Sequence, residues 1–91
     1  MFRIWGKIFE KNHLIKDTVV EDDSSLNRTR KVFRGLENVC RTFDLSVPIW
    51  LDKNVSEFQR RGKTRFGKDN FIEEIDFDYL EMQILEEDEF F

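Results

Sequence analysis

Two side chains have the greatest potential for covalent chemistry in this 91-residue chain, the single cysteine Cys40 and the single histidine His13. A cysteine nucleophile needs a neighbouring base that stabilises its thiolate. Cys40 falls on the apolar stripe of a predicted helix, where burial raises the pKa of a thiol, and His13 begins a strand at a solvated turn. We therefore expect a buried, inert cysteine and no cysteine–histidine catalysis.

Other chemistries fail on spacing or on ligand number. Residues 62–64, GKT, match the end of a phosphate-binding P-loop, but the first glycine of that motif would fall at Glu57. One Cys and one His fall short of a zinc ligand set. Paired acids such as Glu73 and Glu74 are solvated by default, because general acid–base catalysis needs two carboxylates in unlike environments. We expect no enzyme, no metal and no cofactor.

Charge is distributed unevenly along the chain. Residues 1–72 contain 15 basic and 10 acidic residues, whereas residues 73–91 contain nine acidic residues and no Lys or Arg. Basic residues are densest in residues 60–68, RRGKTRFGK, just before the acidic end. The two blocks either attract unlike partners or neutralise each other by packing together, and composition leaves both alternatives open.

The basic segment is a candidate site for phosphate or nucleic acid. Its cations would contact phosphates by charge, and an exposed phenylalanine among them would stack on an unpaired base. The acidic residues that follow directly would repel nucleic acid or mask the cations, so this function is the alternative hypothesis. The residues of this alternative site are Arg60, Arg61, Lys63, Arg65, Phe66 and Lys68.

The first hypothesis is a non-catalytic protein-interaction module. The chain contains ten Phe, two Trp and one Tyr, and large aromatic side chains are enriched at protein interfaces. A small sheet also leaves strand edges unprotected, which favours a homodimer. The candidate contact residues are Trp5, Phe9, Trp50, Phe90 and Phe91.

Two strands are predicted near the N-terminus. Apolar residues alternate along Phe2–Glu10, and this alternation places Trp5 and Phe9 on the outer face. His13–Val20 is a second, β-branched run after a short polar break, which is typical of a β-hairpin. The apolar residues of this run change phase, which predicts either a bulge or burial of both faces.

Helices are predicted from the spacing of apolar and capping residues. Leu26–Phe43 carries one continuous apolar stripe, which is typical of an amphipathic helix. Asn54 and Glu57 have the spacing of a capping box, which predicts that a shorter helix begins there and ends near Gly62. The same spacing at Asn70 predicts one helical turn.

The third strand is predicted at Leu80–Glu86, after a phase switch that indicates a bulge or a boundary between two elements. Pro48 makes Leu45–Leu51 a crossing segment or an edge strand rather than a central strand. Residues 86–91 are expected to be a mobile acidic tail. The chain therefore predicts one α+β domain, an antiparallel sheet of about three strands packed against one main helix, with a second short helix.

Several strings resemble those of small uncharacterised proteins of anaerobic Gram-positive bacteria, namely FRIWGKIF, VPIWLDKN, KTRFGKDNFIEEIDFDYLE and the closing EED. The resemblance covers most of the chain and implies a bacterial cytoplasmic setting, with no activity, cofactor or site residue attached. A lone cysteine excludes an intramolecular disulfide, and no apolar run is typical of a signal peptide or a membrane span. We therefore expect a cytoplasmic protein without a membrane partner.

Overall fold

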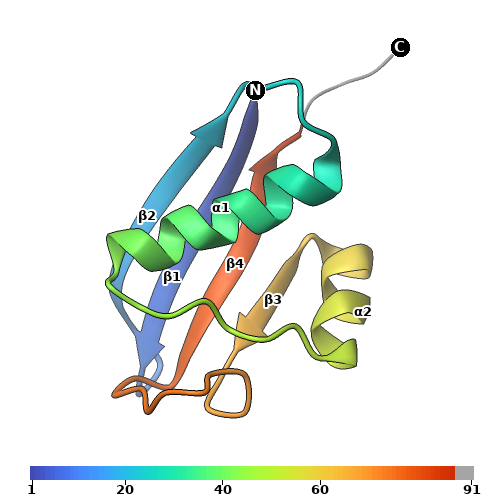
Figure 1. Ribbon diagram of the computed structural model, residues 1–91. Coiled ribbons are helices and arrows are strands. Elements are labelled where there is room, and N and C mark those ends of the chain that lie inside the picture. Colours follow the sequence, from blue (N-terminus) through green and yellow to red (C-terminus); the bar gives the residue numbers. More distant parts are fainter. Residues whose placement is uncertain (88–91) are drawn as a thin grey trace.

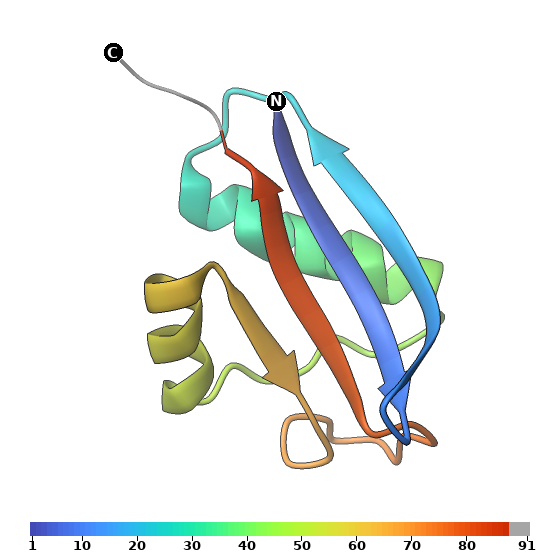
Figure 2. The ribbon, with the colours of Figure 1, turned by 180° about the vertical axis from the view of Figure 1, so that it is seen from behind.

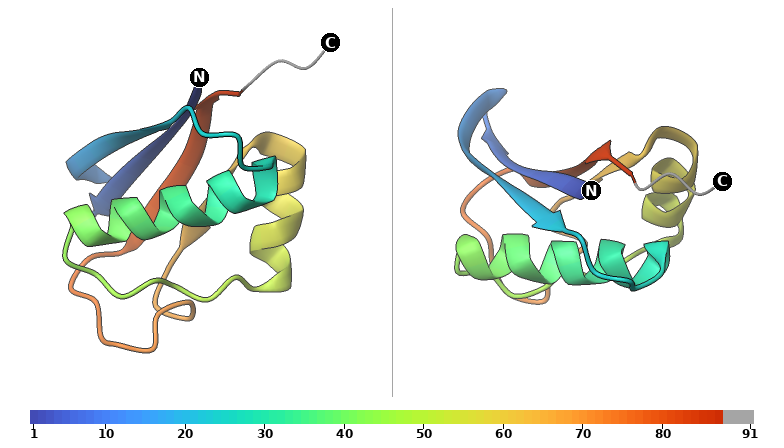
Figure 3. Two further views of the ribbon diagram at one scale, coloured as in Figure 1. Left: turned by 45° about the horizontal axis from the view of Figure 1, so that its top comes forward. Right: turned by 90° about the horizontal axis from the view of Figure 1, so that it is seen from above.

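Four antiparallel strands and two helices make up residues 1–87, the part of the chain that the computed structural model describes (Figure 1). The strands pair in the order β2-β1-β4-β3, and both helices pack on one side of the sheet (Figure 3). The predicted α+β fold is therefore confirmed, with one strand more than expected. In chain order the elements are β1 (Phe2–Glu10), β2 (His13–Asp22), α1 (Arg28–Thr42), α2 (Asp52–Arg61), β3 (Lys63–Phe66) and β4 (Tyr79–Glu86).

The predicted N-terminal hairpin is confirmed, and so is its bulge. Ile8 pairs with Lys16, whereas the next residue, Phe9, pairs with Leu14. Ile15 is therefore an extra residue on β2, which explains the change of phase in the sequence of this strand. Because a bulge twists an edge strand, it also limits how far β2 can pair with a further strand.

Helix α1 packs directly against β1, with a glycine on each side of the contact. A Cβ atom added to Gly6 would lie 2.4 Å from Val39 Cγ1, and one added to Gly35 would lie 2.5 Å from Ile4 Cδ1. Neither glycine position has room for a methyl group, so the two glycines set the distance between helix and sheet.

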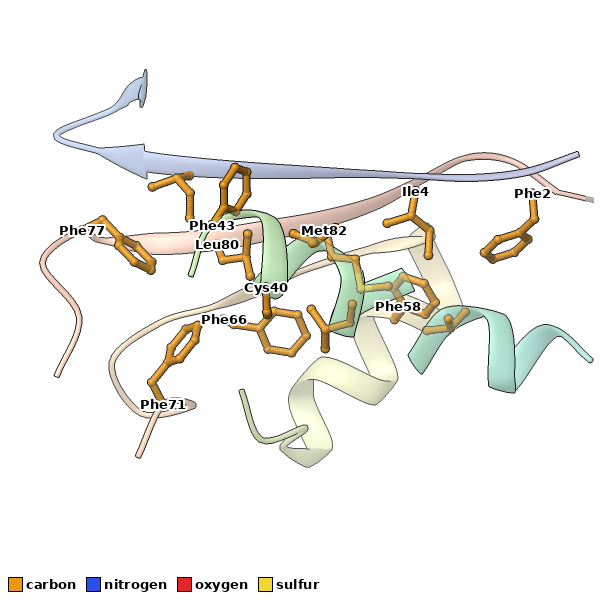
Figure 4. Close-up of a cluster of buried hydrophobic side chains, with 14 residues drawn as sticks. Phe2, Ile4, Cys40, Phe43, Phe58, Phe66, Phe71, Phe77, Leu80 and Met82 are labelled. Atoms are coloured by element: carbon orange, nitrogen blue, oxygen red, sulfur yellow. The ribbon is translucent and has the colours of Figure 1, made fainter. Parts of the chain in front are cut away.

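The hydrophobic core lies between the sheet and the helices (Figure 4). Cys40 belongs to this core, and burial raises the pKa of its thiol to about 11. The thiol is therefore protonated at neutral pH, as the apolar stripe predicts. The core residues are Phe2, Ile4, Ile8, Val32, Leu36, Val39, Cys40, Phe43, Phe58, Phe66, Phe71, Phe77, Leu80 and Met82.

One strand was not predicted, and two local predictions are wrong. Residues 63–66, to which the sequence analysis assigns no element, form the edge strand β3, so the sheet has four strands rather than about three. Helix α2 begins at Asp52, so Asn54 is its third residue and not its N-cap. No helical turn forms at Asn70, which lies in the loop between β3 and β4.

Two buried asparagines explain the errors at positions 54 and 70. Asn54 donates from Nδ2 to Thr64 Oγ1 at 2.9 Å and to the Arg65 carbonyl oxygen at 2.8 Å. Its Oδ1 accepts from the Leu51 N–H at 3.1 Å and from Asn70 Nδ2 at 2.7 Å. All four hydrogen-bonding positions of this side chain are filled, and they join the start of α2 to β3.

Asn70 fastens the crossing segment Leu45–Leu51 to the loop after β3. Its Nδ2 also donates to the Ile49 carbonyl oxygen at 2.8 Å, and its Oδ1 accepts from the Gly67 N–H at 3.0 Å. The Ile49 N–H donates in turn to the Asn70 carbonyl oxygen at 2.7 Å. Residues 45–51 therefore cross the molecule without forming a strand. Within residues 1–87, no helix has the length and apolar character needed to cross a membrane.

Candidate functional site

One face of the sheet is left uncovered by α1 and α2, and it is the candidate interaction surface (Figure 2). Alternate residues of each strand point to this surface, which we call the open face, and strand pairing aligns them in four rows. The rows are Glu21, Arg3 and Glu86; Val19, Trp5, Gln83 and Lys63; Asp17, Lys7, Glu81 and Arg65; and Leu14, Phe9 and Tyr79.

The third row is a ladder of alternating charges. Lys7 Nζ lies 3.4 Å from Glu81 Oε2, and Arg65 Nε lies 3.8 Å from Glu81 Oε1. Lys7 Nζ also donates to Gln83 Oε1 at 2.9 Å. The side chains of Lys7 and Glu81 are only 10% and 7% exposed. Lys7 and Glu81 already pair with each other within the sheet. A second surface that covers them would therefore leave neither of these two charges unpaired.

The aromatic side chains of the open face are held in place by the charged row beside them. Phe9 and Tyr79 stack with their ring centroids 5.1 Å apart. Lys7 Nζ lies 3.9 Å from the centroid of the Trp5 ring, and the guanidinium carbon of Arg65 lies 4.5 Å from that of Tyr79. The Trp5 indole N–H donates to the aspartate of the third row at 2.8 Å. The rings are therefore largely ordered before any partner binds.

The predicted contact residues do not form one site. Trp5 and Phe9 lie on the open face, as the phase of β1 predicts. Trp50 lies on the other side of the sheet, where it lines a cleft between α1 and α2. Phe90 and Phe91 lie outside the residues that the structure describes.

The structure brings together only part of the basic segment, since Arg61, Lys63 and Arg65 line one pocket. Arg60 and Arg61 belong to the last turn of α2, Lys68 to the following loop, and Lys63 and Arg65 to the open face. Phe66, expected to be exposed, is completely buried. The alternation of β3 explains this result, because Lys63 and Arg65 point outward whereas Thr64 and Phe66 point into the core. The proposed stacking of Phe66 on a base is therefore wrong.

The two charge blocks are neighbours in the sheet, because β3 pairs with β4, but few of their charged side chains pair with each other. Among residues 1–87, the pair Arg65–Glu81 is the one ion pair between the basic segment and the acidic residues after position 72. Other acids of that block pair with distant cations instead. Glu86 lies 3.3 Å from Arg3, and Glu87 forms an ion pair with Arg28.

Sequence analysis missed most residues of the open face, including all of those on β4. Tyr79, Glu81 and Gln83 alternate with the buried residues Leu80 and Met82. That alternation was visible in the sequence, but it did not show which strand would pair with β4. Only the pairing of β1 with β4 places Glu81 beside Lys7 and Tyr79 beside Phe9.

Within residues 1–87, no three His, Cys, Asp or Glu side chains are grouped so that they would hold a metal ion. Cys40 is buried, and His13 is exposed at the start of β2. Comparisons of the chain with protein-family models, with curated proteins and with solved structures found no match. The geometry of the open face is therefore the main basis for a functional conclusion.

Proposed function

We propose that the protein is a non-catalytic interaction module of the bacterial cytoplasm, and that it binds a second copy of itself through the open face. The observation that supports this proposal is the alternation of aromatic rows with rows of charges that are already paired. Aromatic residues and Arg are the residue types most enriched at the centres of protein interfaces. The cytoplasmic setting is supported by the sequence resemblance and by a lone buried cysteine.

The apolar content of the open face favours association. Val19 and Leu14 are each 47% exposed, and they flank Trp5 and Phe9 in the second and fourth rows. These apolar side chains lie in two rows on either side of the charged third row, and covering either row removes apolar surface from water. The side chains are also pre-ordered by contacts within the sheet, which reduces the entropy lost when a partner covers them.

A second copy is the partner that the charge pattern suits. The first and third rows each contain both cations and acids. A two-fold axis parallel to the strands, between β1 and β4, would reverse the third row and set Lys7 of one copy against Glu81 of the other. Such an isologous contact needs no second type of surface.

The charge balance of the open face gives the nucleic-acid alternative less support. Its four cations, Arg3, Lys7, Lys63 and Arg65, are matched by four acids, Asp17, Glu21, Glu81 and Glu86. Nucleic-acid sites need an accessible surface with a clear excess of positive charge. Steep salt-dependent binding of a single-stranded oligonucleotide, lost on charge reversal of Lys63 and Arg65, would favour the alternative.

The proposal is tested by the mass in solution of the wild type and of two matched variants. Val19→Lys puts a charge in the second row of the open face, whereas Ile72→Lys changes a loop residue that is 87% exposed. With increasing concentration, the wild type and Ile72→Lys should approach twice the chain mass of 11.1 kDa, and Val19→Lys should remain near that mass. A wild type that stays monomeric up to about 1 mM would refute the proposal.

A further inference from the structure

The helical side of the molecule carries a separate apolar cleft between α1 and α2. Its cavity volume is about 170 Å³, and its walls include Phe33, Trp50, Val55 and Phe58. A cavity of about 150 Å³ is large enough to hold a benzene ring. The cleft is therefore of the right size for one aromatic side chain.

The walls of this cleft are fixed by ring packing, although its mouth is open. Trp50 meets Phe33, Phe58 and Phe66 edge to face, with ring centroids 5.8, 5.5 and 5.1 Å apart. Phe33 is still 47% exposed, and Val55 on the opposite helix is 42% exposed. Two apolar side chains therefore face water on either side of a rigid tryptophan, an arrangement typical of a binding pocket.

The charge at this end of α1 indicates the kind of ligand. The first two turns of α1 contain four basic residues and no acid, although the N-terminus of a helix is the positive end of its dipole. Cations at this end lower the stability of the helix. Residues that disfavour their own local structure are often found at functional sites. The Asp22 carboxylate already interacts with Lys31 and Arg34, and Arg28 is the one of these four cations that lines the cleft.

The chain itself shows which group binds at the edge of the cleft. Arg28 lines the cleft, and its guanidinium carbon lies 5.6 Å from the centroid of the Phe58 ring. The carboxylate of Glu87 forms an ion pair with the same guanidinium group, which is half exposed. A carboxylate is thus already accommodated directly beside the apolar wall.

We propose that the α1–α2 cleft binds a short acidic segment of a partner protein. One aromatic side chain of the segment would enter between Phe33 and Val55, and a neighbouring carboxylate would bind Arg28 in competition with Glu87. This site goes beyond the proposed self-association, because it lies on the opposite side of the sheet and shares no residue with the open face.

The experiment is a titration of the ¹⁵N-labelled full chain with the acetylated peptide Glu-Glu-Asp-Glu-Phe-Phe, followed by amide chemical shifts. This peptide has the sequence of residues 86–91, and the labelled protein carries Phe90→Ala and Phe91→Ala so that the peptide is the one source of this sequence in the sample. Shifts are expected in the first half of α1 and in α2. Replacing both Phe of the peptide by Ala should weaken binding about tenfold or more, as expected for the loss of a buried aromatic anchor.

Protein variants separate the cleft from the rest of the surface. Arg28→Glu and Val55→Glu should each weaken peptide binding about tenfold, whereas Val47→Glu, at a residue that is 49% exposed and outside the cleft, should not change it. Val19→Lys on the open face should also bind the peptide normally, so failure of one proposal is distinguishable from failure of the other. The proposal is overturned if about 3 mM peptide causes no shifts in α1 and α2, or if both cleft variants bind like the wild type.

Discussion

Replacing Asn70 with alanine would remove the side chain that joins three separate segments of the chain. Asn70 is 1% exposed, and its three hydrogen bonds reach Ile49, Asn54 and Gly67. Alanine would leave the partly buried Ile49 carbonyl and Gly67 N–H without this partner. Asn54 would lose one of its four hydrogen bonds but would keep its contacts with α2 and β3.

The expected loss of stability follows from the groups that are left unpaired. A buried polar group without a partner costs about 1–3 kcal/mol. With two backbone groups orphaned, and with some access of water to the loop, we expect Asn70→Ala to lower the free energy of unfolding by about 2–4 kcal/mol. A domain of this size has a total stability of about 5–14 kcal/mol, so the variant should fold but be clearly weakened.

Urea denaturation followed by tryptophan fluorescence measures this effect. With a slope of about 1 kcal/mol per molar urea, the midpoint should fall by about 2–4 M. The matched control is Asn38→Ala on the surface of α1, where the side chain accepts one hydrogen bond from Arg41 at 3.2 Å. The control should change stability by less than about 0.5 kcal/mol. Equal midpoints for the two variants would refute the role assigned to the buried asparagines.

Three further outcomes are expected. Gly6→Ala should lower the free energy of unfolding by about 1–3 kcal/mol in the same urea assay, because its methyl group would lie 2.4 Å from Val39 Cγ1. Cys40, whose thiol pKa burial raises to about 11, should react with a disulfide reagent at neutral pH only when the protein is unfolded. Hydrogen bonds from Ser24 lower the pKa of Asp22 below 3.8 in the folded protein. The contribution of the Asp22 carboxylate to stability should therefore be present above pH 3.8 and should be lost as the pH falls through the pKa of Asp22 in the folded protein. Acid titrations of stability should be flatter for Asp22→Asn, and an unchanged profile would contradict this.

The elements that were predicted correctly are those whose buried face repeats within a short stretch of sequence. The alternation in β1 and the apolar stripe of α1 each report one buried face, and they need no knowledge of the partner element. Strand β3 was missed because it contains four residues and one large apolar side chain, Phe66. Its charges suggested an exposed segment, although only alternate residues are exposed.

The asparagine errors have a different physical cause. Asn54 and Asn70 each stand three residues before an acid, a spacing that is typical of helix starts. Their actual partners include groups up to 21 residues away along the chain. Local sequence cannot distinguish a side chain that caps its own helix from one that bonds a distant backbone, because both require the same residue type.

The candidate site was predictable only strand by strand. The phase of β1 placed Trp5 and Phe9 outward, but the rows of the open face depend on pairing between residues more than 70 positions apart, such as Lys7 and Glu81. The charge ladder therefore depends on topology rather than on any motif. Residues 60–68 are likewise distributed over a helix, a strand and a loop, which their sequence does not show.

Amide chemical shifts of the ¹⁵N-labelled wild type, recorded across a dilution series, test most directly whether the open face binds a second copy. We expect the amide shifts of Trp5, Lys7, Tyr79 and their row neighbours to depend on concentration, and the amide shifts of α1 and α2 to stay constant. In the Val19→Lys variant, the amide shifts of the open face should no longer depend on concentration. Spectra that do not change with concentration, or shifts confined to the helical side, would contradict the account.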